Sequence, residues 1–193
     1  MKKVISLENL KKIIEKKKLK RKKVVLCHGV FDLLHLGHIK HFNEAKNFGN
    51  TLVVTITSDQ YVNKGPQRPF FNENHRAEAI AALSAVDYVV INRNSTAVKV
   101  IRDLKPNIYC KGSDYKLAKN DISGEIKNEI KEVKKYGGRT IFTNKDTFSS
   151  SNLINKFDNI YSTGQKSILN KIKKKYQISQ IRNTFENFNK TKI

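Results

Sequence analysis

The stretch KVVLCHGVFDLLHLGHIKHF, residues 23–42, contains two patterns that decide the fold. Its first part is a β-branched apolar run that ends at Gly29, which is typical of a buried strand. Its last part opens the segment HIKHFNEAKNFG, which has helical spacing and closes at Gly49. A buried strand that leads into a helix is the first unit of an alternating α/β chain.

The rest of the chain repeats this alternation. Further strands are predicted at residues 51–59, 87–92, 107–112 and 139–144. Helices are predicted at residues 7–18, where Ser6 is the cap, and at 74–85, 96–104, 123–138 and 149–157. Regular alternation predicts a doubly wound, five-stranded parallel sheet with helices on both faces, followed by a C-terminal helical extension.

The length of 193 residues suits one packed domain with extensions. We expect a basic N-terminal helix at 1–23, the main domain at 24–157, and a basic helical tail or linker at 158–193. No apolar run is long enough to span a membrane, and the basic start leads into an amphipathic pattern rather than a signal peptide. Cys27 and Cys110 lie in strand-like runs, so reduced, buried thiols and a cytoplasmic location are expected.

The net charge of +21 raises the alternative of a nucleic-acid-binding protein. Residues 1–23 carry a balance of +9 and residues 158–193 one of +6, which leaves only +6 for the residues between them. Because the excess lies on the flanks, where charged faces are usually solvated, nucleic acid is not the expected partner.

Histidines gather where a ligand should bind. In a parallel sheet, ligands bind beyond the carboxyl ends of the strands, and both the HLGH turn and KGSD follow predicted strands directly. His35 and His38 could be ordinary polar residues at a helix start, or zinc ligands with Cys27 and His28. A third interpretation is phosphate binding, because residues three apart share a helix face beside free N–H groups at the helix N-terminus.

Five motifs, in order, resemble those of the HxGH nucleotidyltransferase superfamily, which includes cytidylyltransferases and heptose-phosphate adenylyltransferases. They are GVFDLLHLGH (29–38), VNKGPQRPFFNENHRAEAIAALSAVDYVV (62–90), KPNIYCKGSDY (105–115), YGGRTIF (136–142) and TFSSSNLI (147–154). The resemblance covers residues 24–157 and implies a Rossmann-like fold.

Details within these motifs favour one branch. KGPQRP and KGSDY are most similar to the heptose-1-phosphate adenylyltransferase branch, and TFSSSNLINKF to the nucleotidyltransferase half of proteins fused to a sugar kinase. Two positions depart from the superfamily: Ile154 replaces the arginine of its serine motif, and Asn144 stands where glycerol-phosphate enzymes have an arginine. A cytidylyltransferase acting on glycerol-3-phosphate or another polyol phosphate is the alternative.

The resemblance implies that a sugar phosphate oxygen attacks the α-phosphorus of ATP or CTP and releases pyrophosphate. His35, His38 and Lys64 would then be catalytic. The implied nucleotide-binding residues are Gly29, Val30, Phe31, His35, Gly37, His38, Lys111, Gly112, Asp114, Ser149, Ser150 and Ser151. The implied substrate-binding residues are Asp32, which would also fix its turn, Arg68, and Arg76, which could instead pair with Glu73.

The expected cofactor is Mg²⁺, bound with the triphosphate rather than in a dedicated carboxylate cage. The expected partners are a nucleoside triphosphate, a sugar phosphate, a fused or separate sugar kinase, and a second copy in a symmetric dimer. A module that senses a nucleotide without turning it over is the alternative from another class.

Overall fold

The structure is a computed structural model that describes residues 3–63, 68–113 and 124–143, together with Gly164, Ser167, Ile168 and Lys171. The chain divides into two compact units, Met1–Ser150 and Ser151–Ile193. The four described residues of the second unit are helical. The helix predicted at 149–157 and the domain boundary predicted at 157 lie outside the described residues.

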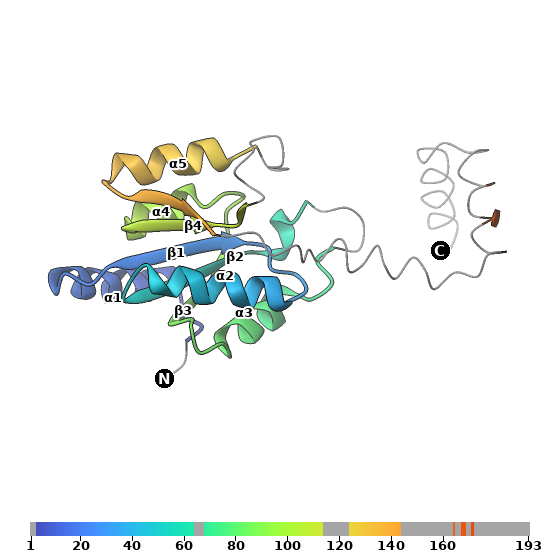
Figure 1. The fold of residues 1–193 in the computed structure, drawn as a ribbon, viewed down its shortest axis with the longest axis horizontal. Coiled ribbons are helices and arrows are strands. Elements are labelled where there is room, and N and C mark those ends of the chain that lie inside the picture. The colour runs from blue at the N-terminus through green and yellow to red at the C-terminus, as the bar shows by residue number, and fades with distance from the viewer. Residues whose placement is uncertain are drawn as a thin grey trace, which may run out of the picture. The chain divides into compact units, whose positions relative to one another are not determined.

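Five parallel strands form one sheet in the order β3-β2-β1-β4-β5 (Figure 1). They are β1 (Val24–Gly29), β2 (Thr51–Thr57), β3 (Tyr88–Asn92), β4 (Ile108–Lys111) and β5 (Arg139–Phe142). The predicted five-stranded parallel sheet is confirmed. Strand β2 ends before its predicted limit because Asp59 opens a 3₁₀ turn, η1 (Asp59–Tyr61).

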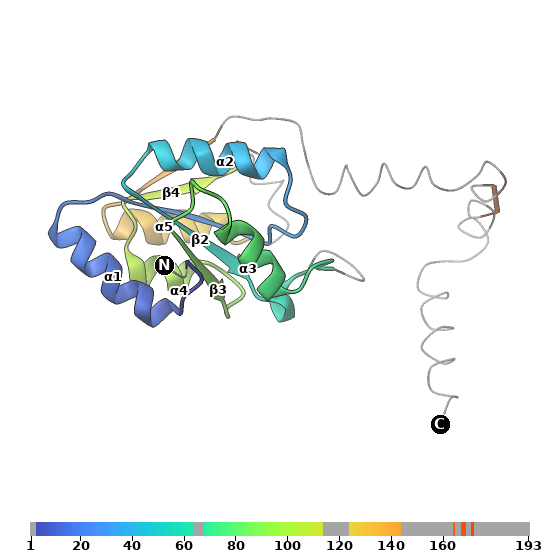
Figure 2. The same ribbon diagram turned by 90° about the horizontal axis from the view of Figure 1, so that it is seen from below.

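Helices cover both faces of the sheet (Figure 2). One face carries α2 (Leu36–Asn47) and α3 (Glu73–Ala81), and the other carries α1 (Leu7–Leu19), α4 (Val98–Leu104) and α5 (Ile126–Lys135). Alternate side chains of β1 therefore enter two cores: Val25 packs with the core under α2 and α3, and Leu26 with the core of the other face. The predicted helices on both faces are confirmed.

The N-terminal helix α1 packs on the sheet despite its many lysines. Ser6 caps it by accepting a hydrogen bond from the N–H of Asn9, as the sequence predicts. Leu10 and Ile14 are fully buried in the core shared with α4 and α5. Burying two such side chains stabilises the fold by about 1.5–3 kcal/mol each. The basic segment at 1–23 thus contains a structural helix of the first unit.

The two cysteines face each other across neighbouring strands. Cys27 of β1 and Cys110 of β4 are paired in register, and both are buried free thiols, as predicted. Burial raises the pKa of Cys27 well above its ordinary value, and the neighbouring Cys110 adds to this effect. These thiols are apolar packing groups of the core.

The strand order places a topological switch point beside β1. From β1 the chain builds outward through β2 and β3, and it then returns to the other side of β1 with β4. Ligands of such sheets bind at the carboxyl ends of the two strands that flank this point. The segments after Gly29 of β1 and after Lys111 of β4 therefore lie where a ligand is expected.

Candidate active site

The HxGH turn brings its two histidines together at the start of α2. His35 is the N-cap, and its Nδ1 accepts a hydrogen bond from the N–H of Gly37 at 3.1 Å. The rings of His35 and His38 stack with their centroids 3.8 Å apart. Because Nδ1 of His35 is an acceptor, the neutral ring carries its proton on Nε2, which can donate to a ligand.

The charge state of His35 also follows from its surroundings. Partial burial lowers the pKa of His35 below its ordinary value. The neutral form is therefore favoured at neutral pH, in which the ring can donate a hydrogen bond but carries no charge. The sequence alone allowed both states.

Phe31 holds this turn in an unusual conformation. Its φ is +48°, in the left-handed region that residues other than glycine rarely adopt. The ring lies edge-on to His38, with centroids 5.3 Å apart, and also contacts Phe42. A Cβ atom on Gly29 would lie 3.0 Å from the Phe31 ring. Glycine at position 29 therefore lets this ring pack back over the end of β1 and support His38.

Asp32 fastens the same turn to the segment 68–71. The Asp32 side chain is almost fully buried, and its carboxylate lies 2.6 Å from Nε of Arg68. It also accepts hydrogen bonds from the N–H groups of Phe70, at 2.7 Å, and Phe71, at 3.1 Å. Asp32 thus fixes its turn from within, and it pairs with one of the predicted substrate-binding cations.

Arg76 ties three segments together from α3. It is 2% exposed, and its guanidinium donates to four protein acceptors: Phe71 O, Val30 O, Thr57 O and Asp59 Oδ1, at 2.6–2.9 Å. The predicted alternative of a pair with Glu73 is wrong, because Glu73 pairs with Arg93 and accepts from the N–H of Asp59. Substrate contact by Arg76 stays a prediction, while the described contacts make Arg76 a tie between the β1–α2 turn, the end of β2 and the segment 68–71.

A buried polar cluster lies under the switch point, on the face of α4 and α5. The Lys111 ammonium lies 3.5 Å from Glu129 of α5, and both residues are at most 5% exposed. Nδ1 of His28 lies 2.9 Å from the hydroxyl of Thr55. Burial lowers the pKa of His28 to about 4, so this imidazole is neutral at physiological pH.

His41 connects α2 to the end of β5. Its Nδ1 lies 2.9 Å from the hydroxyl of Thr143, whose N–H donates to the carbonyl of Lys111 at 2.9 Å. Burial, and next the positive charge of Lys111, lower the pKa of His41 to about 4. The helix that carries His35 and His38 is thereby linked to the ends of β4 and β5.

The structure therefore brings most of the predicted site residues to one edge of the sheet. The β1–α2 turn and its surroundings hold Gly29, Val30, Phe31, Asp32, His35, Gly37, His38 and Arg68. Lys111 and Gly112 lie at the end of the neighbouring strand. Arg76 reaches this edge from α3, and the other predicted residues, Lys64, Asp114, Ser149, Ser150 and Ser151, lie outside the described residues.

Three residues of this edge were missed by the sequence analysis: Glu129, Tyr109 and Thr143. A signal existed for Glu129. In the helix around it, Ile126, Ile130 and Val133 form the apolar stripe, and Glu129 falls on that stripe by helical spacing. A carboxylate on the buried face of a helix requires a buried partner.

The described residues contain no group of three or more histidine, cysteine or carboxylate side chains that could hold a metal ion. The zinc alternative therefore receives no support from this part of the chain. Asp32, a carboxylate of the same turn, is paired with Arg68. In the same residues, no helix has the length and apolar character needed to cross a bilayer.

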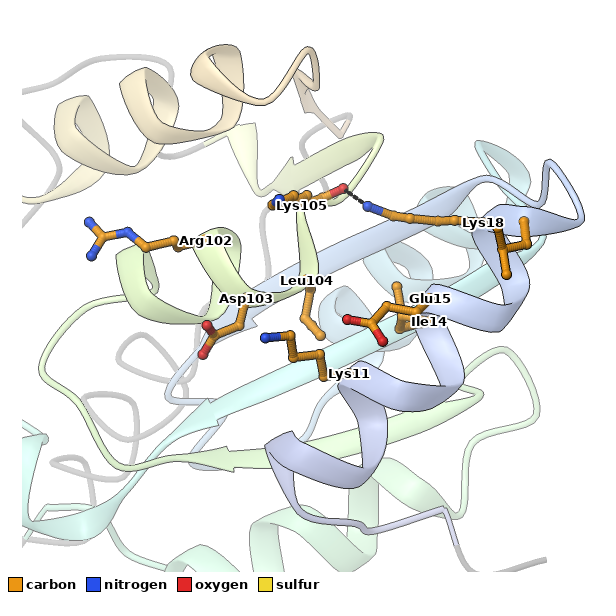
Figure 3. A pocket seen from close by; sticks show the side chains of 9 residues that line it. Lys11, Ile14, Glu15, Lys18, Arg102, Asp103, Leu104 and Lys105 are labelled. Atoms are coloured by element: carbon orange, nitrogen blue, oxygen red, sulfur yellow. Dashed lines mark hydrogen bonds between the residues drawn. The ribbon is translucent and has the colours of Figure 1, made fainter.

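A groove of about 570 Å³ lies at the other end of the sheet, between α1 and α4 (Figure 3). Its cations are largely engaged with neighbours: Lys18 donates to the carbonyl of Lys105, and Arg102 pairs with Glu132 of α5. Both helices lead into strands here, so the groove borders the amino ends of β1 and β4. It is therefore not the ligand site expected for this fold.

Comparisons with known proteins agree with this geometry. The family model Cytidylyltransferase-like matches residues 26–179. Bifunctional protein HldE of Geobacter metallireducens is 40% identical over 162 residues, which cover 82% of this chain and 32% of that protein. Bifunctional protein HldE of Aliarcobacter butzleri is 37% identical over 135 residues, covering 69% and 28%. The chain spans about a third of the length of these curated relatives.

Two solved structures are similar to this one. The lipopolysaccharide core biosynthesis protein from Thermoplasma volcanium has a TM-score of 0.53 and 29% identity, covering 65% of this chain and 99% of that one. Pantoate-beta-alanine ligase from Francisella tularensis has a TM-score of 0.56, covering 88% and 77%, and at 16% identity it shows similarity of fold alone.

Proposed function

Because the chain belongs to the cytidylyltransferase-like family, we propose that it is a nucleotidyltransferase acting on a sugar phosphate. It would transfer the nucleoside monophosphate of ATP to the phosphate of the sugar and release pyrophosphate. The observation that carries this proposal is the stacked pair of His35 and His38 at the start of α2, beside the switch point of the sheet.

The chemistry needs alignment of two anions and stabilisation of the charge that develops on the α-phosphoryl oxygens. A phosphate oxygen of the sugar phosphate forms the new bond to the α-phosphorus, while the bond to the β-phosphate oxygen breaks and pyrophosphate leaves. The Nε2–H of His35 and the imidazole of His38 would donate to the phosphoryl oxygens in the transition state. No covalent intermediate on the protein is required.

The other residues of the turn would prepare the site. The start of α2 is the positive end of the helix, which favours phosphate, and there the N–H of Gly37 orients the His35 ring by donating to its Nδ1. Arg68, held through its Nε by Asp32, would bind a phosphate with the rest of its guanidinium, and Lys64 would be a further cation for the triphosphate. Lys111 and Gly112 would border the nucleoside at the end of β4.

Mg²⁺ fits this site as a companion of the triphosphate. It would neutralise part of the triphosphate charge when bound. Because Mg²⁺ retains waters and readily uses substrate phosphates as ligands, it does not need a cage of protein carboxylates. Asp32 is held by Arg68 and by backbone N–H groups, so the phosphate oxygens would supply most of the coordination.

For the substrates we propose ATP and a heptose-like sugar phosphate, and for the product a nucleotide-activated sugar for surface polysaccharide synthesis. The similarity to Bifunctional protein HldE and to a lipopolysaccharide core biosynthesis protein supports this class. The motifs KGPQRP and KGSDY support ATP over CTP. A cytoplasmic location, a homodimer, and a sugar kinase acting before this enzyme belong to the same proposal.

A substrate panel tests the proposal. Each of the four common nucleoside triphosphates is combined with Mg²⁺ and with heptose-1-phosphate, another sugar-1-phosphate or glycerol-3-phosphate, and pyrophosphate release is measured. We expect release with ATP and the heptose phosphate. Release with CTP and glycerol-3-phosphate would favour the polyol-phosphate cytidylyltransferase instead. Triphosphate binding without release in any combination would favour a nucleotide-sensing module.

A further inference from the structure

Glu129 of α5 contacts the start of α4 and the strand β4 beneath the switch point. Its Oε1 accepts a hydrogen bond from the N–H of Ala97, just before α4, at 3.0 Å. Its Oε2 accepts one from the hydroxyl of Tyr109 in β4 at 2.7 Å. The same oxygen lies 3.5 Å from the ammonium of Lys111, two residues further along β4. Both carboxylate oxygens are thus held by named donors, in a side chain that is 5% exposed.

The Lys111 ammonium in turn reaches the central strand. It donates to the carbonyl of His28 at 3.4 Å, and His28 immediately precedes Gly29, where β1 ends. The ammonium also lies over the ring of Tyr109, 5.5 Å from its centroid. A single buried ion pair therefore connects the carboxyl end of β4 to the carboxyl end of β1, the two strands that flank the switch point.

The surroundings of Glu129 keep its carboxylate charged. Burial acts to raise the pKa of Glu129, but Lys111 and His28 lower it, as do the hydrogen bonds from Tyr109 and Ala97, and the net direction is downward. The carboxylate is therefore ionised at neutral pH. Replacing Glu129 would take away the carboxylate that faces the buried ammonium at 3.5 Å, in surroundings where burying a charge is costly.

We infer that Glu129 is a positioning residue of the nucleotide site: by holding the Lys111 ammonium against the carbonyl of His28, it fixes the ends of β1 and β4 from which the nucleotide-binding segments begin. This role rests on the proposed function. It assigns to α5 a part in nucleotide binding that none of the site motifs indicates, because the helix lies outside the HxGH turn and acts through Lys111.

The helix offers a matched control. Glu132 lies one turn further along α5 and also pairs with a cation of a neighbouring element, Arg102 of α4, at 3.0 Å. Arg102 is 57% exposed and lines the groove at the amino end of the sheet, opposite the switch point. The substitutions Glu129→Gln and Glu132→Gln therefore remove the same charge from the same helix, and only the first removes it from the switch point.

The test measures kcat and the KM for ATP together with amide hydrogen exchange in peptides covering residues 26–32 and 109–113. For Glu129→Gln we expect kcat/KM for ATP to fall by about 10–100-fold, as small misplacements of a site can cause, with faster exchange confined to these two peptides. Tyr109→Phe, which removes one hydrogen bond to Glu129, should show both effects to a smaller extent. Glu132→Gln should show neither.

A purely structural role predicts a different result. In that case Glu129→Gln lowers the unfolding midpoint but leaves the KM for ATP and the exchange of the two strand ends at their wild-type values, and this outcome overturns the inference. If Glu129→Gln does not fold, Tyr109→Phe decides, and wild-type values in that variant overturn the inference equally. Absence of pyrophosphate release from the wild-type protein would instead contradict the proposed function, while the exchange measurement still tests the positioning.

Discussion

The two ends of the same sheet differ in how they use polar residues. At the amino ends of the strands, the groove between α1 and α4 is rich in lysine and arginine, and two of these cations, Lys18 and Arg102, contact neighbours on the surface. At the carboxyl ends, the described polar groups are more buried, and several are held by more than one contact, as Arg76 is by four acceptors.

The candidate site is therefore distinguished by polar groups that are buried and held by protein partners, and not by a high density of charge. Exposed ion pairs contribute little, because both partners are well solvated and must lose side-chain freedom to meet. A buried guanidinium or imidazole can be accommodated only where the backbone supplies its partners. The carboxyl end of the sheet carries such groups on both faces, and the strained turn at Phe31 lies between them.

Arg76→Met should give the largest loss of stability. It removes the donors of Val30 O, Thr57 O and Phe71 O and leaves Asp59 without its ion-pair partner. Each buried carbonyl left without its donor costs about 1–3 kcal/mol, whereas Asp59 is 38% exposed and can be solvated. The free energy of unfolding from urea titration is the measurement. Arg93→Met, which removes a 69% exposed arginine paired with α3, is the control, and an equal loss in both variants would contradict the comparison.

Acid should destabilise the protein through His28 and His41. Both have a folded pKa of about 4 against an ordinary value of 6.5, so the unfolded chain takes up their protons first as the pH falls. Stability is therefore lost between pH 6.5 and pH 4 and levels off below that, by roughly 3 kcal/mol for each group. His41→Gln keeps a hydrogen-bonding group near Thr143 and should flatten this part of the curve; an unchanged slope would refute the assignment.

Gly29→Ala and Gly49→Ala place the same methyl group at opposite ends of β1. At position 29 the new Cβ meets the Phe31 ring at 3.0 Å, so the ring and His38 should shift and turnover should fall by about 10-fold or more. At position 49 the new Cβ meets Lys23 O at 2.9 Å, which should lower the unfolding midpoint but leave kcat unchanged. Equal loss of turnover in both variants would remove the distinction between the two ends.

Arg102→Gln in the groove should have the smallest effect. Its guanidinium is 57% exposed in the pair with Glu132, so the unfolding midpoint should change little and pyrophosphate release should not change measurably. Loss of activity from this substitution would show that the amino end of the sheet takes part in function. It would contradict the proposed difference between the two ends.

The alternation of strands and helices could be predicted from the sequence because each strand is a short β-branched run bounded by glycine or polar residues. Boundaries were less accurate. The helix α2 begins at Leu36, two residues before the predicted start, because His35 acts as its cap through its ring nitrogen. Histidine is not among the usual capping residues, so the spacing of apolar residues alone could not place this start.

The site residues that belong to a sequence motif, such as His35 and His38, could be predicted. Those that depend on contacts between distant segments were harder to predict. The partners of Arg76 come from three segments far apart in the chain, and local spacing suggested Glu73 instead. The pair of Lys111 and Glu129 likewise depends on how α5 packs on β4. Such contacts follow from the tertiary arrangement and leave only indirect traces in the sequence.

The double variant His35→Ala/His38→Ala tests the central claim most directly. Pyrophosphate release, triphosphate binding and the unfolding midpoint are measured for this variant beside His75→Ala, which alters an exposed histidine of α3. We expect release to fall by at least the roughly 10²–10³-fold that the loss of one oriented donor costs, with a smaller change in binding and stability. A folded double variant that releases pyrophosphate at the wild-type rate would contradict the HxGH turn as the catalytic centre.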